Sequence, residues 1–507
     1  MATDPAVMST ITHWFDGREQ PGLSGTSLAV TNPATGQVTG RMSVADAGDA
    51  AAVIASAAEA ARAWCRVSIT TRARVLFRFR ELLDARKDEL AAIITREHGK
   101  VHSDALGEIA RGLEVVEFAC GIPHLLKGGY SESVSTGVDV HSIRQPLGVV
   151  GIISPFNFPA MVPMWFFPLA IATGNTVVLK PSEKDPSAAL WMARLWTEAG
   201  LPDGVFNVLQ GDKVAVDALL HSPDVAAISF VGSTPIAQYV FEQASASGKR
   251  VQALGGAKNH LLVLPDADLD AVADAAVSAG YGSAGERCMA ISVVVAVDPV
   301  GDELVARIAD RTSGLRVGDG DSDESDMGPL VTREHADRVL DLIRQGEDAG
   351  AKVVVDGRAT PHAGTEGGYW VGPTLFDHVT AEMTIYTEEI FGPVLSVVRV
   401  GSYREGLDLI NANPYGNGTA IFTADGAAAR QFENEVQVGM VGINVPIPVP
   451  MAYYSFGGWK RSLFGDTHAH GTDGVHFFTR GKVVTSRWGD PAARRSAGVD
   501  LGFPRHD

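Results

Sequence analysis

The segment SFVGSTPIAQ, residues 229–238, has the pattern of a buried strand that passes through a tight turn into a helix. Pro235 suits the first turn of a helix, and the serine and threonine before it are residues that cap helix starts. Free N–H groups and the helix dipole at such a position attract a phosphate. The segment therefore predicts a strand–turn–helix unit, with either a phosphate site at Gly232 and Ser233 or a plain helix cap there.

Similar apolar strand patterns recur on both sides of this unit, at GVVGII (148–153), NTVVLKP (175–181), VFNVL (205–209) and VQALGG (251–256). Helical patterns lie between them, for example over Ser187 to Ala199 and Ile236 to Ser247. Strands of this kind, alternating with helices, indicate a parallel sheet covered on both faces. A second such series runs from HLLVLPDADLD (260–270) to VGMVGINVP (438–446), so the expected fold class is α/β with two parallel sheets.

Three further regions complete the predicted organisation. Residues 45–120 have helical patterns rich in alanine, arginine and glutamate. Residues 131–145 alternate around a Thr-Gly pair and predict a hairpin. The segment GVHFFTRGKVVTSRW (474–488) is strand-like, and an edge strand on such an extension often pairs with another subunit.

Bulk composition excludes several classes of partner. The chain has 507 residues, which suggests two or three domains, and its net charge of −18 argues against nucleic acid or an anionic membrane as the main partner. The start, MATDPAVMST, lacks the pattern of a secretory signal, and the longest apolar stretch, 160–172, is interrupted by prolines. Three cysteines do not make a disulfide framework, so we expect a cytoplasmic protein with free thiols.

Charged residues at one strand end point to a nucleotide. Lys180 closes the strand within VVLKPSEKDP (177–186), and Glu183 follows three residues later. In open α/β sheets, ligands bind beyond the carboxyl ends of the strands, where this pair could share the hydroxyls of a ribose. A carboxylate there would repel a 2′-phosphate, which favours NAD over NADP, although a surface ion pair would have the same spacing.

Two residues are candidates for covalent chemistry. Cys288, in the loop AGERCMA (284–290), is either a nucleophile or a structural thiol. Asn157, in the aromatic loop that follows GVVGII, is either a hydrogen-bond donor to an oxyanion or a turn asparagine. His468, His470 and His476 have no supporting cysteine or acid cluster, so we expect no metal site.

These segments together resemble the aldehyde dehydrogenase superfamily over roughly residues 12–489. The shared motifs, in order, are NPATG (32–36), PFNFP (155–159), LKPSE (179–183), FVGST (230–234), LGG (254–256), the Cys288 loop, EEIFGPV (388–394) and SFGGWKRS (455–462). The resemblance implies two doubly wound parallel-sheet domains with a small β oligomerisation unit, in a dimer or tetramer. The implied boundaries are 1–125 and 148–254 for an NAD-binding domain, 255–446 for a catalytic domain, 126–147 and 470–490 for the oligomerisation unit, and 491–507 for a tail.

The resemblance also implies a role for individual residues. Cys288 stands at the family's nucleophile and Asn157 at its oxyanion donor. The implied cofactor-binding residues are Ser154, Phe156, Lys180, Ser182, Glu183, Lys184, Gly232, Ser233, Glu389 and Phe391.

One position departs from the family's usual pattern. Most hydrolytic members carry ELGG, where the glutamate activates water, but here Ala253 occupies that position. Alanine cannot accept a proton, so the acyl thioester on Cys288 needs another acceptor, such as coenzyme A. This departure, with GAKNH, GERCMA and NVPIPVP, is typical of the coenzyme A-acylating branch that oxidises methylmalonate and malonate semialdehydes to propionyl-CoA and acetyl-CoA with loss of carbon dioxide or bicarbonate. The alternative is a hydrolytic NAD-dependent semialdehyde dehydrogenase with a different base.

A carboxylated substrate needs a cation, and arginine is the usual carboxylate clamp. Arg287 precedes the nucleophile, and Arg111 lies on a helix that the fold should place at the tunnel mouth. Both are candidate substrate contacts; the other interpretations are a loop ion pair for Arg287 and a surface arginine for Arg111.

Overall fold

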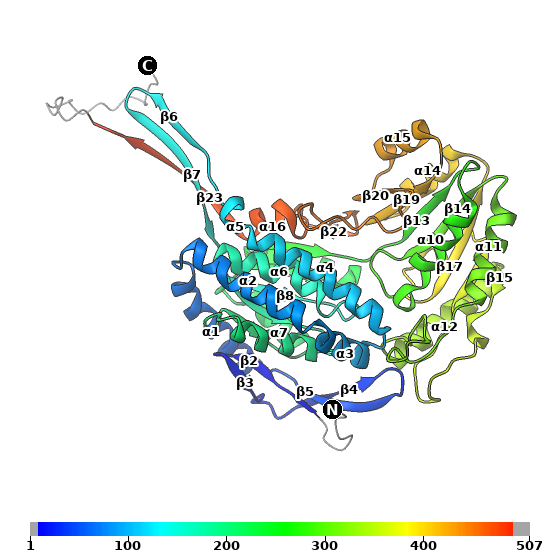
Figure 1. Cartoon of the computed structure of the whole chain (residues 1–507), viewed down its shortest axis with the longest axis horizontal. Coiled ribbons are helices and arrows are strands. Elements are labelled where there is room, and N and C mark those ends of the chain that lie inside the picture. Colours follow the sequence, from blue (N-terminus) through cyan, green and yellow to red (C-terminus); the bar gives the residue numbers. More distant parts are fainter. Residues whose placement is uncertain (1–8, 490–507) are drawn as a thin grey trace.

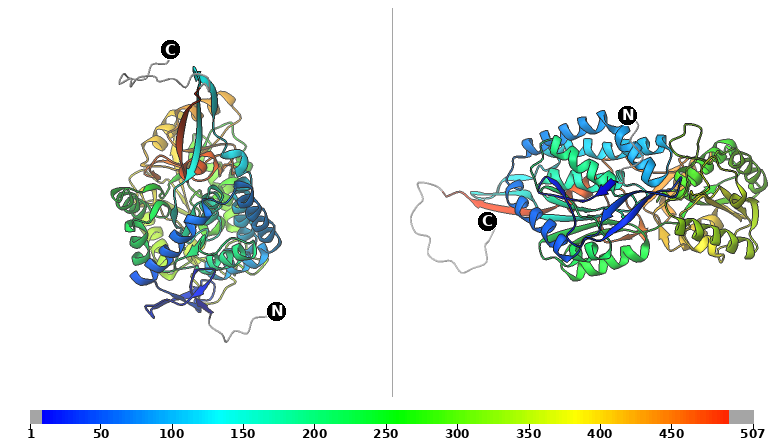
Figure 2. Two further views of the ribbon diagram at one scale, coloured as in Figure 1. Left: turned by 90° about the vertical axis from the view of Figure 1, so that its left-hand side faces the viewer. Right: turned by 90° about the horizontal axis from the view of Figure 1, so that it is seen from below.

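The computed structural model describes residues 9–489 and contains two α/β units, each built on one large sheet, with a β arm that projects from the first unit (Figure 1). The arm points away from the second unit in both views in which the two units lie side by side (Figures 1 and 2). The predicted tail 491–507 lies outside the described residues. Among residues 9–489, no helix is both long and apolar enough to cross a membrane.

The first sheet has eight strands, and its five central strands are parallel, as predicted. Their order is β12–β11–β8–β9–β10, and their bounds are β8 (Val149–Ile153), β9 (Thr176–Lys180), β10 (Phe206–Val208), β11 (Val225–Val231) and β12 (Arg250–Leu254). The order changes direction at β8, which lies between β9 and β11. Such a switch point creates a crevice beyond the carboxyl ends of the strands, where ligands bind in doubly wound folds.

Short antiparallel strands that the sequence did not predict extend this sheet at its edges. They are β2 (His13–Phe15), β3 (Arg18–Gln20) and β22 (Leu463–Phe464). A separate three-stranded sheet near the N-terminus contains β1 (Ser9–Ile11), β4 (Ser27–Asn32) and β5 (Gln37–Ser43).

Alternation along the central strands explains why helices cover both faces of the first sheet. Val150 and Ile152 of β8 join one apolar cluster, and Val149 and Ile153 join another. The helices α6 (Met161–Thr173) and α7 (Ser187–Glu198) cover the first face, and α1 (Ala47–Trp64), α8 (Lys213–His221) and α9 (Thr234–Ala246) cover the second. Every residue of α6 is buried, because the outer helices α2 (Ile69–Ala85), α3 (Lys87–His98) and α4 (His102–Cys120) lie over that layer. The region 45–120 is therefore helical, as predicted.

The second sheet has seven strands in the order β15–β16–β17–β14–β13–β19–β20, and all but β15 are parallel to their neighbours. The bounds are β13 (Asn259–Val263), β14 (Ile291–Val297), β15 (Lys352–Val355), β16 (Thr374–Asp377), β17 (Val394–Val400), β19 (Gly418–Phe422) and β20 (Met440–Ile443). Its helices are α10 (Leu269–Tyr281), α11 (Gly301–Ser313), α12 (Arg333–Asp348), α14 (Tyr403–Ala412) and α15 (Gly426–Glu435). These elements share one apolar core, so the second predicted α/β series is present.

The β arm contains the predicted hairpin, β6 (Tyr130–Ser135) and β7 (Val138–Pro146), with β23 (Thr479–Arg487) paired antiparallel to β7. The prediction that the whole segment 474–488 is a strand is wrong at its start, where α16 (Gly471–Phe477) is helical. Val475, Phe477 and Phe478 are all buried, and α16 packs on α6. Two adjacent buried phenylalanines break the alternation that a half-buried strand needs.

Candidate active site

A cavity of about 450 Å³ is lined by residues of both units. The first unit contributes residues that follow β8, β11 and β12: Pro155, Phe156, Asn157, Gly232, Ser233, Thr234, Gly255 and Gly256. The second unit contributes Cys288, His335, Arg338, Glu388, Glu389, Phe391 and Tyr415. The cavity therefore lies at the carboxyl ends of the central strands of the first sheet, as expected for a doubly wound fold.

Asn157 lies in an irregular loop between β8 and α6. Its side chain is 4% exposed and lines the cavity, and its main-chain oxygen accepts a hydrogen bond of 2.6 Å from Lys100 Nζ. The loop begins at Ser154, whose N–H donates to Lys180 O over 3.1 Å. The ring of Phe156 meets the ring of Phe391 edge-on at 5.9 Å, so the two walls of the cavity touch.

Lys180 and Glu183, which the sequence suggested as ribose contacts, form an ion pair at the end of β9. Lys180 Nζ lies 3.1 Å from Glu183 Oε2. Burial acts to raise the pKa of the Glu183 carboxyl, but the attraction of Lys180 and hydrogen bonds to the carboxylate act in the opposite direction and are stronger together. The pKa is therefore lowered, and the carboxylate is held in its charged form. Ser182 Oγ accepts from Lys184 N–H, and Lys184 Nζ lies 4.2 Å from the centre of the Phe156 ring. Unlike Phe156, the other four residues are not among those that line the cavity but lie beside it: Lys180, Ser182, Glu183 and Lys184.

The turn predicted from SFVGSTPIAQ opens directly on the cavity. Helix α9 begins at Thr234, and its capping residue Ser233 accepts no hydrogen bond through its side chain. Thr234 Oγ1 instead accepts from Gly256 N–H over 2.8 Å, which joins this turn to the loop after β12. The N–H groups at the start of α9 are thus not satisfied by the Ser233 hydroxyl.

The Cys288 loop follows α10 through a left-handed turn. Ser283 and Ala284 have φ angles of 54° and 52°, which non-glycine residues rarely adopt, and Gly285 has 73°. A side chain at Gly285 would collide with the main chain of Gly392, so the loop packs tightly against the segment after Phe391. The left-handed turn thus carries the chain directly from α10 to the cavity.

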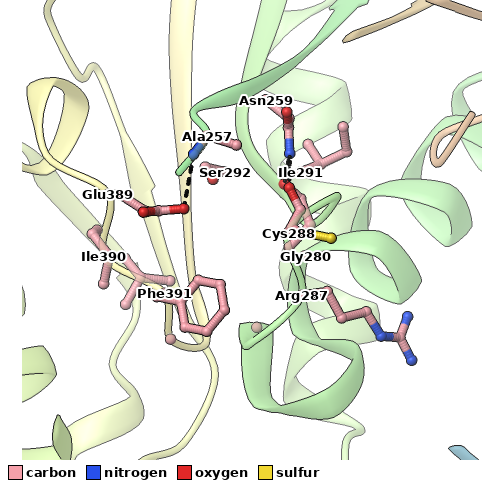
Figure 3. A pocket seen from close by; sticks show the side chains of 14 residues that line it. Ala257, Asn259, Gly280, Arg287, Cys288, Ile291, Ser292, Glu389, Ile390 and Phe391 are labelled. Carbon is pink, nitrogen blue, oxygen red and sulfur yellow. Dashed lines mark hydrogen bonds between the residues drawn. The ribbon is translucent and has the colours of Figure 1, made fainter. Parts of the chain in front are cut away.

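Two asparagines hold the main chain at Cys288. Asn259 Nδ2 donates to Cys288 O over 2.9 Å, and Asn417 Nδ2 donates to the same oxygen over 3.1 Å. Figure 3 shows Asn259 directed at this carbonyl, with the sulfur on the other side of the residue. Burial raises the pKa of the Cys288 thiol to about 12, and the nearby Glu389 adds to the rise. The thiol is therefore protonated at neutral pH.

Glu389 and Phe391 stand opposite Cys288 (Figure 3). Glu389 Oε1 accepts from Ala257 N–H over 2.9 Å, and burial raises the pKa of its carboxyl. Phe391 has a φ of 59°, and its main-chain oxygen lies 2.7 Å from His335 Nε2. Arg338 donates to the main-chain oxygens of Glu389 and Ile390, each over 3.0 Å.

The two candidate arginines do not line this cavity. Arg111, on α4, lies 2.9 Å from Glu114 Oε2 and contacts Met451 Sδ at 3.5 Å. Arg287 pairs with Asp104 at 2.5 Å and lines a separate cavity of about 340 Å³. It also lines the small pocket drawn in Figure 3, which it shares with Cys288 and Glu389. In Figure 3 its side chain extends away from Glu389 and Phe391.

Ala253 is completely buried in β12, between Phe230 of β11 and Phe464 of β22. It lies on the face of the sheet that carries α9, and the neighbouring Gly255 and Gly256 line the cavity in its place.

Several residues around the cavity were missed by the sequence analysis: Lys100, Glu108, Asn259, His335, Arg338, Tyr415 and Asn417. Asn259 belongs to the motif GAKNH that we had singled out, so a closer look at that motif could have found it. Lys100 and Glu108 carry no such signal, because charged residues on helical segments normally indicate a solvated surface.

A nucleotide-binding switch point facing a cysteine loop across one cavity is the arrangement of a cofactor-dependent enzyme. The chain belongs to the aldehyde dehydrogenase family, whose model matches residues 21–484. This confirms the family to which the motifs had pointed.

Individual relatives within this family are similar to the chain over nearly its whole length. A malonate-semialdehyde dehydrogenase of Pseudomonas aeruginosa is 54% identical, with 98% of this chain and 100% of the relative covered. Among solved structures, a methylmalonate-semialdehyde dehydrogenase of Oceanimonas doudoroffii is 54% identical, with a TM-score of 0.95 and coverage of 96% of this chain and 100% of that one. A candidate methylmalonate-semialdehyde dehydrogenase of Sinorhizobium meliloti 1021, solved in complex with NAD, is 52% identical, with a TM-score of 0.94 and coverage of 96% and 99%. These matches also confirm the predicted fold class.

Proposed function

We propose that the chain is an NAD-dependent, coenzyme A-acylating dehydrogenase. It oxidises malonate semialdehyde and methylmalonate semialdehyde to acetyl-CoA and propionyl-CoA, with loss of carbon dioxide or bicarbonate. The observation that carries the proposal is that Cys288 and Asn157 line the same cavity while Ala253 stands at the family's position for the water-activating glutamate. The relatives whose names contain these substrates support the choice.

The residues of the first unit fit NAD. The uncapped start of α9 at Gly232 and Ser233 suits a pyrophosphate, and the Lys180–Glu183 pair suits the hydroxyls of a ribose. Glu389 and Phe391, on the opposite wall, are placed for the nicotinamide half. Ser154, Phe156, Ser182 and Lys184 surround these contacts and belong to the same proposed site.

The chemistry begins at sulfur. The Cys288 thiol releases its proton to solvent, and the sulfur adds to the aldehyde carbon as the carbonyl π bond opens to an oxyanion. The side-chain amide of Asn157 and the main-chain N–H of Cys288 donate to the oxyanion that forms. NAD, when bound, would supply the acceptor for the hydride that leaves this carbon, and an acyl thioester would then remain on Cys288.

The acyl group then leaves by exchange. Ala253 offers no proton acceptor, so water is not activated from that position. The thiol of coenzyme A displaces the Cys288 sulfur, which releases an acyl-CoA and needs no activated water. The β-carboxylate departs as carbon dioxide because a thioester enolate stabilises the electrons that it leaves behind. Arg111 and Arg287 are the proposed partners of that carboxylate while the substrate is bound.

A product assay tests this function. Purified protein is given NAD and either semialdehyde, with coenzyme A present or omitted. With coenzyme A we expect continuous NADH formation and acyl-CoA as product; without it, we expect one NADH per subunit followed by near-arrest. Free carboxylic acid released equally fast without coenzyme A would instead support the hydrolytic dehydrogenase.

Assembly and location belong to the same proposal. The arm presents β6 and β23 as open edges, and Tyr130, Val134, Val483 and Trp488 leave apolar surface exposed on it, which suits a homo-oligomer, a dimer or a tetramer. Light scattering of the purified chain measures that state. The three unpaired cysteines are in keeping with a cytoplasmic enzyme.

A further inference from the structure

A buried ion pair stands directly behind the loop that carries Asn157. Lys100 follows α3 and its left-handed terminal residue Gly99, and the side chains of Lys100 and Glu108 are both 0% exposed. Lys100 Nζ lies 2.9 Å from Glu108 Oε2 and donates to Asn157 O over 2.6 Å. It also lies 4.3 Å from the centre of the Phe158 ring, so the ammonium is enclosed on several sides.

The other carboxylate oxygen of Glu108 holds the far end of the same loop. Glu108 Oε1 accepts from Ala160 N–H over 2.8 Å and from Met161 N–H over 3.0 Å. These are N–H groups at the start of α6, which have no partner within the helix, and a negative charge is favoured there by the helix dipole. Lys100 therefore binds the main chain just before residues 158 and 159, and Glu108 binds it just after them.

Stability alone does not explain this buried ion pair. Burying two charges costs several kcal/mol per ion before their attraction is counted, and apolar residues of similar volume are often at least as stabilising. The loop has no regular secondary structure, so few main-chain hydrogen bonds fix the direction of the Asn157 side chain. A fixed main-chain oxygen at Asn157 constrains the backbone and thus the Cα–Cβ direction from which the amide extends into the cavity.

We propose that Lys100 and Glu108 are positioning residues that hold the Asn157 amide where the oxyanion develops. The inference rests on the proposed function, in which Asn157 donates to that oxyanion. Neither residue lines the cavity, so both act through Asn157 rather than by touching substrate. Because donors pre-set for the developing charge contribute strongly to catalysis, a small displacement of this amide lowers the turnover rate while leaving cofactor binding unchanged.

A double-mutant cycle tests the inference. Glu108→Gln keeps the size of the side chain and an acceptor for the N–H groups of α6, but removes the charge that orients Lys100. We expect it to lower kcat with malonate semialdehyde, NAD and coenzyme A by about 10-fold, a fraction of the roughly 10²–10³-fold cost of losing an oxyanion donor. KM for the semialdehyde and the Kd for NAD stay within about twofold. In an Asn157→Ala background, Glu108→Gln then changes kcat by less than about twofold, because the group it positions is gone.

Two outcomes overturn the inference. The first is a full 10-fold effect of Glu108→Gln in the Asn157→Ala background, which means that the pair acts elsewhere. The second is an unchanged kcat for Glu108→Gln in the parent protein. If Asn157→Ala alone leaves kcat unaltered, the oxyanion role in the proposed function has failed, which is a distinguishable result.

A second variant protects the test against misfolding. Lys100→Met removes the ammonium but preserves the two bonds from Glu108 to α6, and the same cycle applies to it. Thermal unfolding of each variant, measured with NAD bound, separates loss of folded protein from loss of rate. Lys100→Arg restores a cation, and we expect it to recover part of the rate that Lys100→Met loses.

Discussion

The loops that carry Asn157 and Cys288 face one cavity from opposite units. Each loop is held by hydrogen bonds to a main-chain oxygen, that of Asn157 in one loop and that of Cys288 in the other. At Asn157 the donor is an ammonium, Lys100 Nζ, within a buried ion pair. At Cys288 the donors are two neutral amides, those of Asn259 and Asn417. Holding the main chain leaves both reactive side chains without a hydrogen-bond partner among residues 9–489. The neutral donors add no positive charge beside the thiol, which is consistent with its high pKa.

The largest effect on the rate is expected from a substitution in the Cys288 loop. Cys288→Ala should lower NADH formation by at least about 10⁴-fold, as removal of a nucleophile does elsewhere. Steady-state assays with malonate semialdehyde measure it. Cys65→Ser is the matched control, because that thiol is exposed at the end of α1 and should leave the rate unchanged. Residual dehydrogenase activity in Cys288→Ala near the parent level would remove the sulfur from the mechanism.

The second prediction tests whether burial, with the nearby Glu389, keeps the thiol protonated. With a pKa of about 12, the thiolate fraction of Cys288 rises about tenfold per pH unit and has no plateau below pH 10. In a Cys65→Ser/Cys120→Ser background, the rate of alkylation by iodoacetamide should therefore increase by about 10³-fold between pH 7 and pH 10. Mass spectrometry of the modified protein follows it. A rate that levels off near pH 8 would show that the thiol is activated before any ligand binds.

Sequence patterns predicted the elements around Asn157 better than the turn before Cys288. The strands that end near Asn157, Lys180 and Gly232 were located to within about two residues, because apolar runs between helices have few alternatives. The left-handed Ser283 and Ala284 before Cys288 were not predictable, since neither residue type favours a positive φ. Likewise, α16 was missed because Val475 and Phe477 keep the two-residue spacing of a strand, which only the adjacent Phe478 breaks.

Contacts between distant segments were beyond the sequence in both units. Lys100 and Asn157 are far apart in the chain, and only the packing of α4 on α6 brings them together. The placement of Arg287 was open for the same reason, because its partner Asp104 belongs to the other unit. The roles of the candidate site residues therefore stay predictions, whereas the fold class and the family are confirmed.

The third prediction compares the two amides that hold Cys288 O. Asn259 also donates to Ala290 O and accepts from Gly418 N–H, so Asn259→Ala leaves several buried groups unpaired. We expect a loss of about 2–3 kcal/mol in unfolding free energy and about a 10-fold lower kcat. Asn417→Ala removes the bond to Cys288 O and a contact to Met289 Sδ, and should have smaller effects on both. Denaturant titration and single-turnover NADH formation measure them; equal effects would mean that the two amides are interchangeable.

The smallest effect concerns the two candidate arginines, Arg111 on α4 and Arg287 in the Cys288 loop. Arg111 is 38% exposed on its side chain and paired with Glu114, and such a surface pair contributes at most about 1 kcal/mol, so the arginine can change partner at little cost. Arg111→Leu should raise KM for malonate semialdehyde by about 10-fold, the value of one charge-assisted carboxylate contact, and leave KM for propanal unchanged. Arg287→Leu should lower the melting temperature as well, because it strands Asp104, whose side chain is only 17% exposed. An equal change of KM for both aldehydes in Arg111→Leu would exclude a carboxylate contact, since propanal carries no carboxylate and would then be responding to a general change in the cavity.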